Sequence, residues 1–526
     1  MVVRMRSRAR HLLTLPACTC AGLAVWAAFP PIGAWWAAPL GLALLASALR
    51  DRGPWAGAGL GLVFGVALFT PMLHFTAVAM GNPVGWVALT AVESLYLAAF
   101  GAAWALASRI GHLERPTATA LLARMLAFTV IWCGVEELRS SWPWGGFPFG
   151  RLAFAMADAP MLPFAAYGGI VGLSALVALV GAGVAEAAHA LRRRRAFNAL
   201  VAAALAGAVV VAPVALPMES SAQDGTLRVG AVQGNVAEEF EDAFNRALEV
   251  TGNHAEATLT LAETVGRGTL DVVIWPENAA DLDPRDVPAS ATLVEAAAQA
   301  VGAPVLVGAM SYADGVRYND MVVWTPGVGA GEYYRKHRPV PFAEYIPLRE
   351  QLRHITEQVD RIGTDLAPGT GPQTLTIHAA AQDRDVTLAM GICFEVAYED
   401  TLRAGVEQGG EVIVIPTNNA SFLHSSEAEQ QLAQGRIQAV MHGRALVQVS
   451  TVGVTAIINP RGVVEQRTQA YTQASLVADV PLRTSITVAD RLGAAPGLAA
   501  QLGAALLAAA GMVSGVSRLR RRRRRA

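Results

Sequence analysis

Eight apolar stretches constrain the fold of this chain more than any other feature. A run of about 20 apolar residues is long enough to cross a bilayer as a helix. Only 16% of the 526 residues are charged, whereas a soluble domain carries about 25% charged residues. The sequence therefore predicts an α-helical membrane domain with eight transmembrane helices, near residues 11–29, 34–49, 56–79, 85–108, 117–138, 162–190, 197–216 and 493–515.

Arginines gather in every second connection between these spans, as expected for a protein threaded through a membrane. Positive residues are enriched in cytoplasmic loops. Starting inside, seven spans place residue 217 outside the cytoplasm, and the eighth returns a basic tail, residues 517–526, to it. A signal peptide is the alternative for the first span, but further spans follow at once and no cleavage site stands out. The arginines concerned are Arg50, Arg52, Arg109, Arg115, Arg192–Arg195, Arg518 and Arg520–Arg525.

The polar segment before the last span has the pattern of an α/β domain. We expect seven helices over residues 1–217, a linker at 218–225, an extracytoplasmic domain over 226–487 and the eighth helix over 488–516. Within the polar domain, short β-rich runs alternate with helical segments, which is typical of α/β folds. The helices are predicted at Glu239–Val265 and Ser290–Val301, and the strands at Leu227–Gln233, Asp271–Trp275, Pro304–Gly308, Asp320–Trp324, Val386–Cys393, Val412–Pro416, Leu446–Thr451 and Val454–Asn459.

The sequence lacks the usual signatures of cofactor, metal and nucleic-acid binding. No phosphate-binding loop and no GxGxxG fingerprint follows a predicted strand. No His/Cys cluster has the spacing of a metal site, and four cysteines suggest no disulfide framework. We therefore expect neither a cofactor nor a metal, and no nucleic-acid partner.

One thiol and one amine stand out in the polar domain. The stretch Val386–Glu395, VTLAMGICFE, reads as a buried strand that ends in Cys393, with helix-competent sequence from Tyr398. A thiol at the start of a helix would face its positive end, which favours the thiolate. Lys336, in YYRKHRPVPF, is the only lysine in the whole chain. Because lysine is a compact donor whose pKa can be tuned, its single use indicates a specific role.

Glu277 completes a chemically consistent set with these two residues. It follows the predicted strand Asp271–Trp275, and the carboxyl ends of strands are where α/β sites gather. Cys393 can act as nucleophile, Glu277 as proton acceptor and donor, and Lys336 as the donor to a developing oxyanion. Singly, a glutamate is usually a solvated charge and a thiol usually packs in a core. The combination favours catalysis.

The motifs around these residues resemble the carbon–nitrogen hydrolase (nitrilase) superfamily, with its Glu–Lys–Cys triad. They are WPEN at 275–278, KHRPVPFAEYIP at 336–347 and GICFE at 391–395. The closer similarity is to the apolipoprotein N-acyltransferase family, in which such a domain lies between seven membrane helices and one. Weaker supporting matches are FPPIG at 29–33, EELR through GGFPFG at 136–150, GGIVGLS at 168–174 and VQGN at 232–235.

This resemblance implies a nitrilase-like αββα sandwich and a two-step acyl transfer in a bacterial plasma membrane. Cys393 would take an acyl chain from a membrane phospholipid as a thioester. The α-amino group of an apolipoprotein's diacylglyceryl-cysteine would then accept it. Glu277 would serve as base, and Lys336 would hold the oxyanion with a backbone N–H near Cys393. Glu344 and Glu395 match further acidic positions of the family and would orient Lys336 and the nucleophile region.

The sequence departs from the family pattern in two places, and three other functions stay open. The stretch Asn418–Phe422 lacks the usual aspartate and tryptophan, and in Arg436–Arg444 Gln438 and Met441 replace an arginine and a glutamate. A degenerate paralogue that binds lipoproteins without acylating them is therefore one alternative. A membrane-anchored amidase is another, although one span would anchor it. A transporter or receptor is the third, although the spans hold few ionisable residues.

Overall fold

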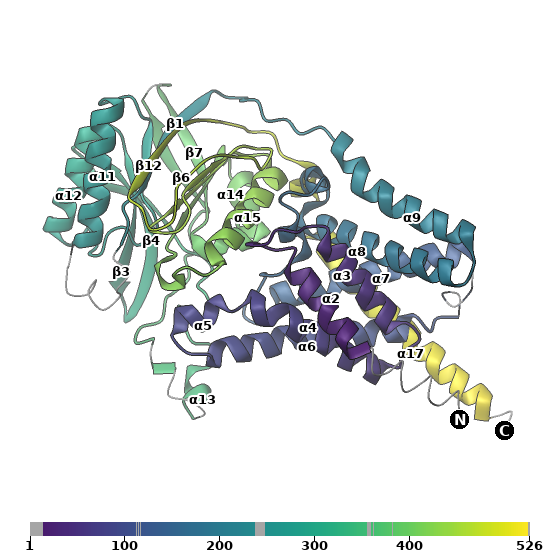
Figure 1. The fold of residues 1–526 in the computed structure, drawn as a ribbon. Helices are drawn as coiled ribbons and strands as arrows, with labels where there is room; N and C mark the ends of the chain where they lie inside the picture. The colour runs from purple at the N-terminus through teal and green to yellow at the C-terminus, as the bar shows by residue number, and fades with distance from the viewer. Residues whose placement is uncertain are drawn as a thin grey trace. The chain divides into compact units, whose positions relative to one another are not determined.

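The structure is a computed structural model that describes residues 14–111, 113, 115, 117–236, 248–354, 359–360, 362–380 and 382–523. The chain divides into two compact units (Figure 1). The first, here the helical unit, comprises Met1–Pro217 and Leu492–Ala526. The second, here the αββα unit, comprises Met218–Arg491.

Apolar helices build the helical unit. Among the described residues, six helices are long and apolar enough to cross a membrane: α4, α6, α7, α8, α9 and α17. Helices α2 and α3 lie where the first two spans were predicted but have only 13 residues each, and the third predicted span divides into α4 and α5. The helices are α2 Thr14–Trp26, α3 Ala37–Leu49, α4 Pro54–Met72, α5 Phe75–Met80, α6 Val84–Ala107, α7 Ala118–Ser141, α8 Ala165–Arg192, α9 Ala196–Val211 and α17 Ala495–Arg523.

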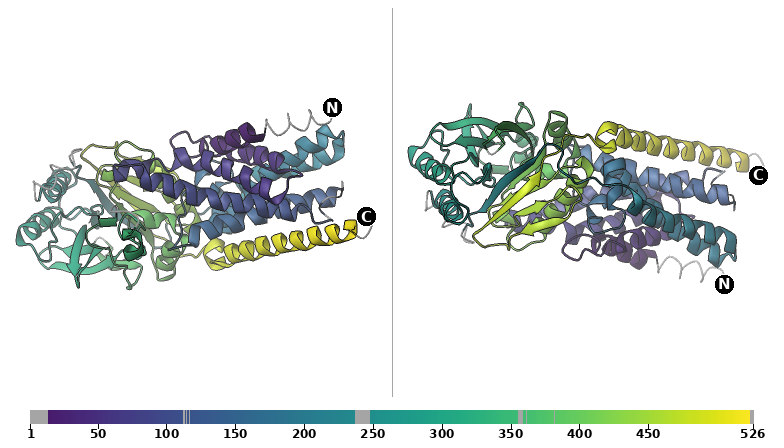
Figure 2. Two further views of the ribbon diagram at one scale, coloured as in Figure 1. Left: turned by 90° about the horizontal axis from the view of Figure 1, so that it is seen from below. Right: turned by 90° about the horizontal axis from the view of Figure 1, so that it is seen from above.

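Small residues let neighbouring helices in this unit approach closely. A Cβ on Gly61 of α4 would lie 2.1 Å from the carbonyl oxygen of Leu97 on α6, and one on Gly57 would lie 2.3 Å from that of Gly101. Close backbone contact of this kind is typical of membrane helices. Helix α17, from the other end of the chain, packs against α6 and α7 (Figure 2).

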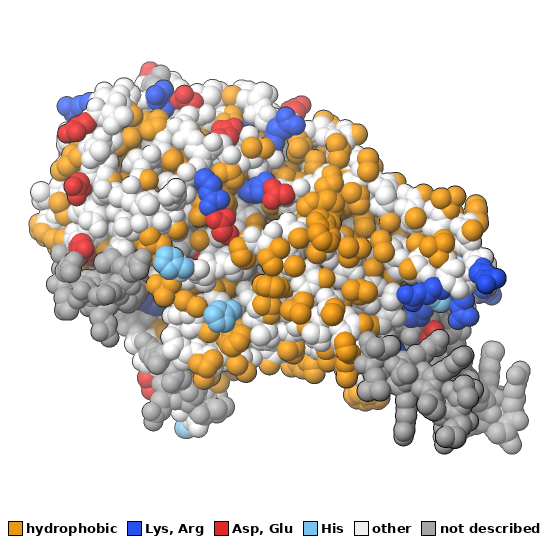
Figure 3. Space-filling model, viewed as in Figure 1, with side chains coloured by type: hydrophobic (Ala, Val, Ile, Leu, Met, Phe, Trp, Pro, Cys, Tyr) orange, Lys and Arg blue, Asp and Glu red, His pale blue; other side chains and the backbone are white. Residues whose placement is uncertain are grey.

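The outward faces of these helices are apolar. Leu200 on α9 and Leu506 on α17 are both largely exposed, and hydrophobic side chains cover much of the visible face of the helical unit (Figure 3). Exposed apolar surface on this scale fits contact with lipid rather than water. The helical unit therefore has the surface of a membrane domain.

Two six-stranded sheets form the centre of the αββα unit. Their orders are β12-β1-β2-β3-β4-β5 and β11-β10-β9-β8-β7-β6. Strands β1, β2 and β3 run parallel, as do β7, β8 and β9. The strands are β1 Thr226–Gln233, β2 Val272–Ile274, β3 Val305–Ala313, β4 Val316–Thr325, β5 Gly329–Arg335, β6 Thr374–Ala379, β7 Arg384–Met390, β8 Val412–Thr417, β9 Leu446–Ser450, β10 Ala456–Ile458, β11 Val464–Arg467 and β12 Ala474–Pro481.

Three apolar cores hold the layers of this unit together. Between the sheets, side chains such as Leu306 of the first sheet and Leu388 of the second share one core. Helices α11 (Glu249–Val265) and α12 (Pro288–Val301) cover the outer face of the first sheet, and α14 (Glu399–Glu407) and α15 (Glu427–His442) that of the second (Figure 1). The predicted αββα sandwich is confirmed.

The predicted strands all coincide with observed ones, but four strands were not predicted. Strands β5, β6, β11 and β12 escaped the sequence pattern. Residues 239–247, the first part of the predicted helix Glu239–Val265, lie outside the described residues. The remaining elements are short helical turns, at η1 Leu152–Ala155, η2 Leu162–Phe164, η3 Ala212–Ala215, α13 Arg349–Arg353, η5 Cys393–Ala397, η6 Ala420–Phe422 and α16 Val488–Leu492.

Candidate active site

The αββα unit brings the three candidate catalytic side chains together. Glu277 follows β2 and Lys336 follows β5, both in the first sheet, while Cys393 follows β7 in the second. The Nζ of Lys336 lies 3.3 Å from Oε1 of Glu277. The Cys393 thiol lies within electrostatic range of both. An acid, an amine and a thiol therefore share one site, to which both sheets contribute residues.

Glu277 is held in place by two hydrogen-bond donors besides Lys336. The side-chain amide of Asn319 donates to Oε1 over 2.6 Å, and the backbone N–H of Asn418 donates to Oε2 over 2.9 Å. Only 3% of Glu277 is exposed. Burial raises the pKa of the Glu277 carboxyl, despite the opposing effect of these donors and of Lys336. A carboxylate with a raised pKa is a stronger base toward a thiol.

Lys336 lies between two carboxylates and is almost wholly buried, with 1% exposed. Its Nζ donates to Oε1 of Glu344 over 2.7 Å, and Glu344 also accepts from the backbone N–H of Val340. Burial alone would lower the pKa of Lys336, but the charges of Glu277 and Glu344 outweigh it and raise that pKa. Lys336 therefore stays an ammonium and suits the stabilisation of an anion, not the abstraction of a proton.

The surroundings of Cys393 differ from the prediction in two ways. Strand β7 ends at Met390, and Cys393 opens a single 3-10 turn, so that α14 begins only at Glu399. The thiol thus does not lie at the start of an α-helix. Desolvation and the nearby charge of Glu277 raise the pKa of Cys393. The expectation of a favoured thiolate is therefore wrong, and the thiol needs a base to become a nucleophile.

Glu395 links the turn that carries Cys393 to the segment that follows β5 and carries Lys336. It is fully buried. One oxygen accepts from the Ile392 backbone N–H and the Tyr334 hydroxyl, each over 2.7 Å. The other accepts from the backbone N–H groups of His337 at 2.7 Å and Arg338 at 2.8 Å. Because these four donors bind the same carboxylate, they hold the turn of Cys393 and the segment of Lys336 in fixed positions relative to each other.

A Glu395→Gln variant is expected to lose about 1–3 kcal/mol of stability, because an amide N–H would face donors where an acceptor is required. Thermal unfolding in detergent measures the change. Glu407→Gln, an exposed change at the end of α14, is the matched control and should stay within about 0.5 kcal/mol of wild type. Equal stability of the two variants would contradict the bridging role of Glu395.

Sequence reasoning missed the polar residues that surround this site. Besides Asn319, they include Gln431, whose Nε2 lies 3.7 Å from Sγ of Cys393, and Glu427, whose pKa burial raises to about 8. Both lie on α15, whose first half reads as a polar helix yet is buried almost throughout. The sequence offers one signal for them: a polar helical segment between two apolar strands. If such a segment is buried, its polar groups need partners, as in a site.

The residues that depart from the family pattern are built into the same surroundings. Asn419 donates to Glu427 over 2.7 Å and accepts from the hydroxyl of Ser450 over 2.6 Å. Gln438 donates to the backbone oxygen of Val396 over 2.7 Å, next to the nucleophile turn. The side chains of Asn419 and Gln438 are therefore both engaged in hydrogen bonds close to the nucleophile.

The fold of the αββα unit is that of a carbon–nitrogen hydrolase. The model of the carbon-nitrogen hydrolase family matches residues 228–490, and that of the apolipoprotein N-acyltransferase N-terminal domain matches residues 21–183. Taken over the whole length, the chain belongs to the apolipoprotein N-acyltransferase family.

Relatives named apolipoprotein N-acyltransferase cover most of the chain. That of Mycolicibacterium smegmatis is 34% identical over 90% of this chain and 80% of its own. That of Methylococcus capsulatus is 30% identical over 83% of this chain and 84% of its own. That of Azotobacter vinelandii is 29% identical over 87% of each.

Proposed function

We propose that this protein transfers an acyl chain from a membrane phospholipid to an apolipoprotein, through a thioester on Cys393. The acceptor is the α-amino group of the lipoprotein's N-terminal diacylglyceryl-cysteine. The observation that carries the proposal is the buried Glu277–Lys336 pair beside the thiol. Family membership supports the choice of lipid substrates.

In the first step, Glu277 takes the thiol proton as Sγ of Cys393 attacks the ester carbonyl of the phospholipid. Negative charge gathers on the carbonyl oxygen, where Lys336 and a backbone N–H near Cys393 stabilise it. The C–O bond then breaks. The departing lysophospholipid oxygen takes the proton from Glu277, leaving a thioester.

In the second step, the acceptor amine attacks the thioester. Glu277 takes a proton from the amine, and Lys336 again stabilises the oxyanion. The C–S bond breaks, and the sulfur regains its proton. Glu344 positions Lys336, and Glu395 positions the loops that carry Lys336 and Cys393.

The helical unit suits substrates that are themselves lipids. The six apolar helices found among the described residues already exceed what anchoring one catalytic domain requires. In the topology that the arginine pattern predicts, the αββα unit lies on the outer side of a bacterial plasma membrane and both chain ends lie in the cytoplasm. Donor and acceptor would both reach Cys393 from the bilayer.

The test is the intact mass of the purified protein after incubation with phospholipid and an acid quench. We expect an added acyl mass on wild type that hydroxylamine removes, and none on Cys393→Ala. Cys20→Ala, which changes an exposed cysteine on α2, is the matched control and should keep the adduct. No adduct on a thiol that still reacts with a thiol probe would favour the amidase alternative. No adduct on an inert thiol would favour a binding-only paralogue.

A further inference from the structure

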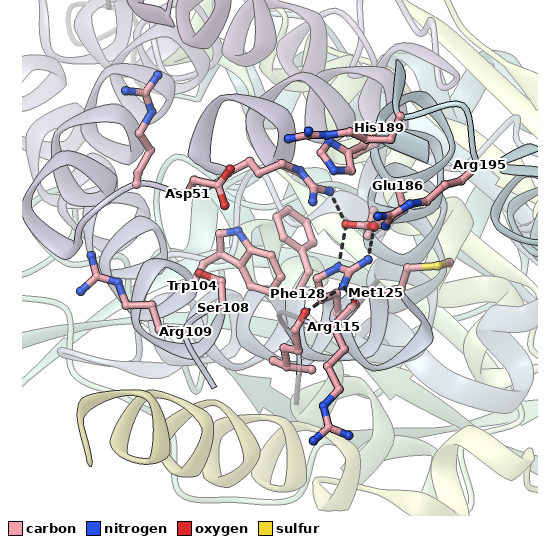
Figure 4. Close-up of a pocket in the computed structure, with 18 of the residues that line it drawn as sticks. Asp51, Trp104, Ser108, Arg109, Arg115, Met125, Phe128, Glu186, His189 and Arg195 are labelled. Atoms are coloured by element: carbon pink, nitrogen blue, oxygen red, sulfur yellow. Dashed lines mark hydrogen bonds and ion pairs between the residues drawn. The ribbon is translucent and has the colours of Figure 1, made fainter. Parts of the chain in front are cut away.

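The helical unit contains a cavity of about 780 Å³ that the proposed reaction does not use (Figure 4). It lies among the C-terminal ends of α3, α6 and α8, the N-terminal half of α7 and the connections that follow α3, α6 and α8, with Gly515 of α17 also in its lining. In the predicted topology, these connections are the arginine-bearing loops on the cytoplasmic side. The cavity therefore lies within the helical unit, at the end that the arginine pattern predicts to be cytoplasmic.

The lining of this cavity is strongly basic. Its lining includes seven arginines but only two acidic residues, Asp51 and Glu186. Glu186 is buried and pairs with two of the arginines: Arg50 donates to one oxygen, and Arg124 binds both oxygens, at 3.1 and 2.6 Å (Figure 4). The arginines that line the cavity are Arg50, Arg52, Arg109, Arg115, Arg124, Arg193 and Arg195.

Positive charge remains in the cavity after these pairs are formed. Within the part of the chain that the structure describes, no acidic side chain forms an ion pair with Arg193 or Arg195. The positive-inside rule accounts for arginines in a cytoplasmic connection, but it does not require their side chains to line a cavity. Two sequence neighbours, Arg192 at the end of α8 and Arg194 in the connection to α9, do not line it. The stretch Arg192–Arg195 therefore offers an internal comparison between arginines that line the cavity and arginines that do not.

The inner wall of the cavity is apolar, in contrast to its arginines. Trp104, Met125 and Phe128 contribute buried side chains, and Ala182 and Ala185 of α8 complete the wall. Arginine forms paired hydrogen bonds with phosphate, and basic pockets between membrane helices on the cytoplasmic side suit anionic headgroups. We propose that this cavity binds a phosphate-bearing anion, either an anionic phospholipid headgroup or free phosphate.

The experiment measures ligand binding to the full chain by native mass spectrometry after delipidation. All proteins carry Cys393→Ala, so that no donor lipid is consumed. Phosphatidylglycerol, phosphatidylcholine and inorganic phosphate are the three probes. The cavity variant is Arg193→Gln/Arg195→Gln, and the matched control is Arg192→Gln/Arg194→Gln, which removes the same charge from the same stretch, Arg192–Arg195.

We expect the cavity variant to bind its anion about 10-fold or more weakly, and the control to bind like the parent protein. Preferential binding of phosphatidylglycerol over phosphatidylcholine, insensitive to inorganic phosphate, supports a lipid headgroup. Binding of inorganic phosphate that competes with phosphatidylglycerol supports free phosphate. The proposal would be overturned if both double variants lost anion binding equally. It would also be overturned if the parent protein bound neither phosphatidylglycerol better than phosphatidylcholine nor inorganic phosphate.

Discussion

A Glu277→Gln variant is expected to form the acyl-enzyme on Cys393 roughly 10²–10⁴-fold more slowly than wild type. Because the pKa of the thiol is raised, the reaction depends on a group that removes its proton. The amide cannot do this, although it has nearly the same shape and can still accept one of the two hydrogen bonds from Asn319 and Asn418. Quenched-flow mass spectrometry of the thioester measures the rate.

The pH dependence separates this role from a structural one. Glu277 must be ionised to act as base, so the wild-type rate should fall as the pH drops through its pKa, which burial raises above the usual 4.5. The Gln variant should lose that decrease. Glu427→Gln, a change to another buried acid near the thiol, is the control and should keep both the rate and the pH profile. An unchanged profile in Glu277→Gln would mean that another group is the base.

A Lys336→Met variant should fail in two distinct ways. The oxyanion loses a charged donor, which costs about 10²–10³-fold in rate. The change also leaves the buried Glu277 and the partly buried Glu344 without their shared cation, which should cost roughly 3–5 kcal/mol of stability. Thermal unfolding and the rate of thioester formation measure the two effects separately.

A double variant tells these effects apart. Lys336→Met/Glu344→Gln also removes one of the two carboxylates that Lys336→Met leaves without a cation. It should therefore recover part of the lost stability, but not the rate of thioester formation. Lys336→Arg keeps the charge but presents a planar fork, and it should fold better than Lys336→Met. If Lys336→Met folded and formed the thioester at the wild-type rate, the ammonium would have no part in catalysis.

The sequence predicted the layers of the αββα unit because buried strands leave a simple apolar pattern. Strand β8, whose residues are all buried, is a continuous apolar run apart from its last residue and a proline. Strand β5 is mostly exposed and polar, so its sequence resembles a loop, and β11 is similar. Edge strands are defined by a neighbour's backbone rather than by their own side chains, which is why the pattern missed them.

The site was predicted in its reacting groups but not in their surroundings. Cys393, Lys336 and Glu277 are conspicuous because each follows a strand and two of them are rare in this chain. The protonation of Cys393 could not be read in the same way. It depends on desolvation and on a carboxylate more than 100 residues away in the chain, which only the folded structure brings near the thiol. The role of Asn319 was hidden for the same reason.

The rarity of lysine has a consequence for a protein that would carry an activated acyl group. A thioester reacts readily with neutral amines, so exposed lysines near such a site would be targets for self-acylation. Lys336 is the one lysine of this chain, and it is buried and kept protonated by two carboxylates, which removes the lone pair that attack requires. No lysine side chain of the protein is therefore a competing acceptor, and the acyl group is left for an amine that arrives from outside.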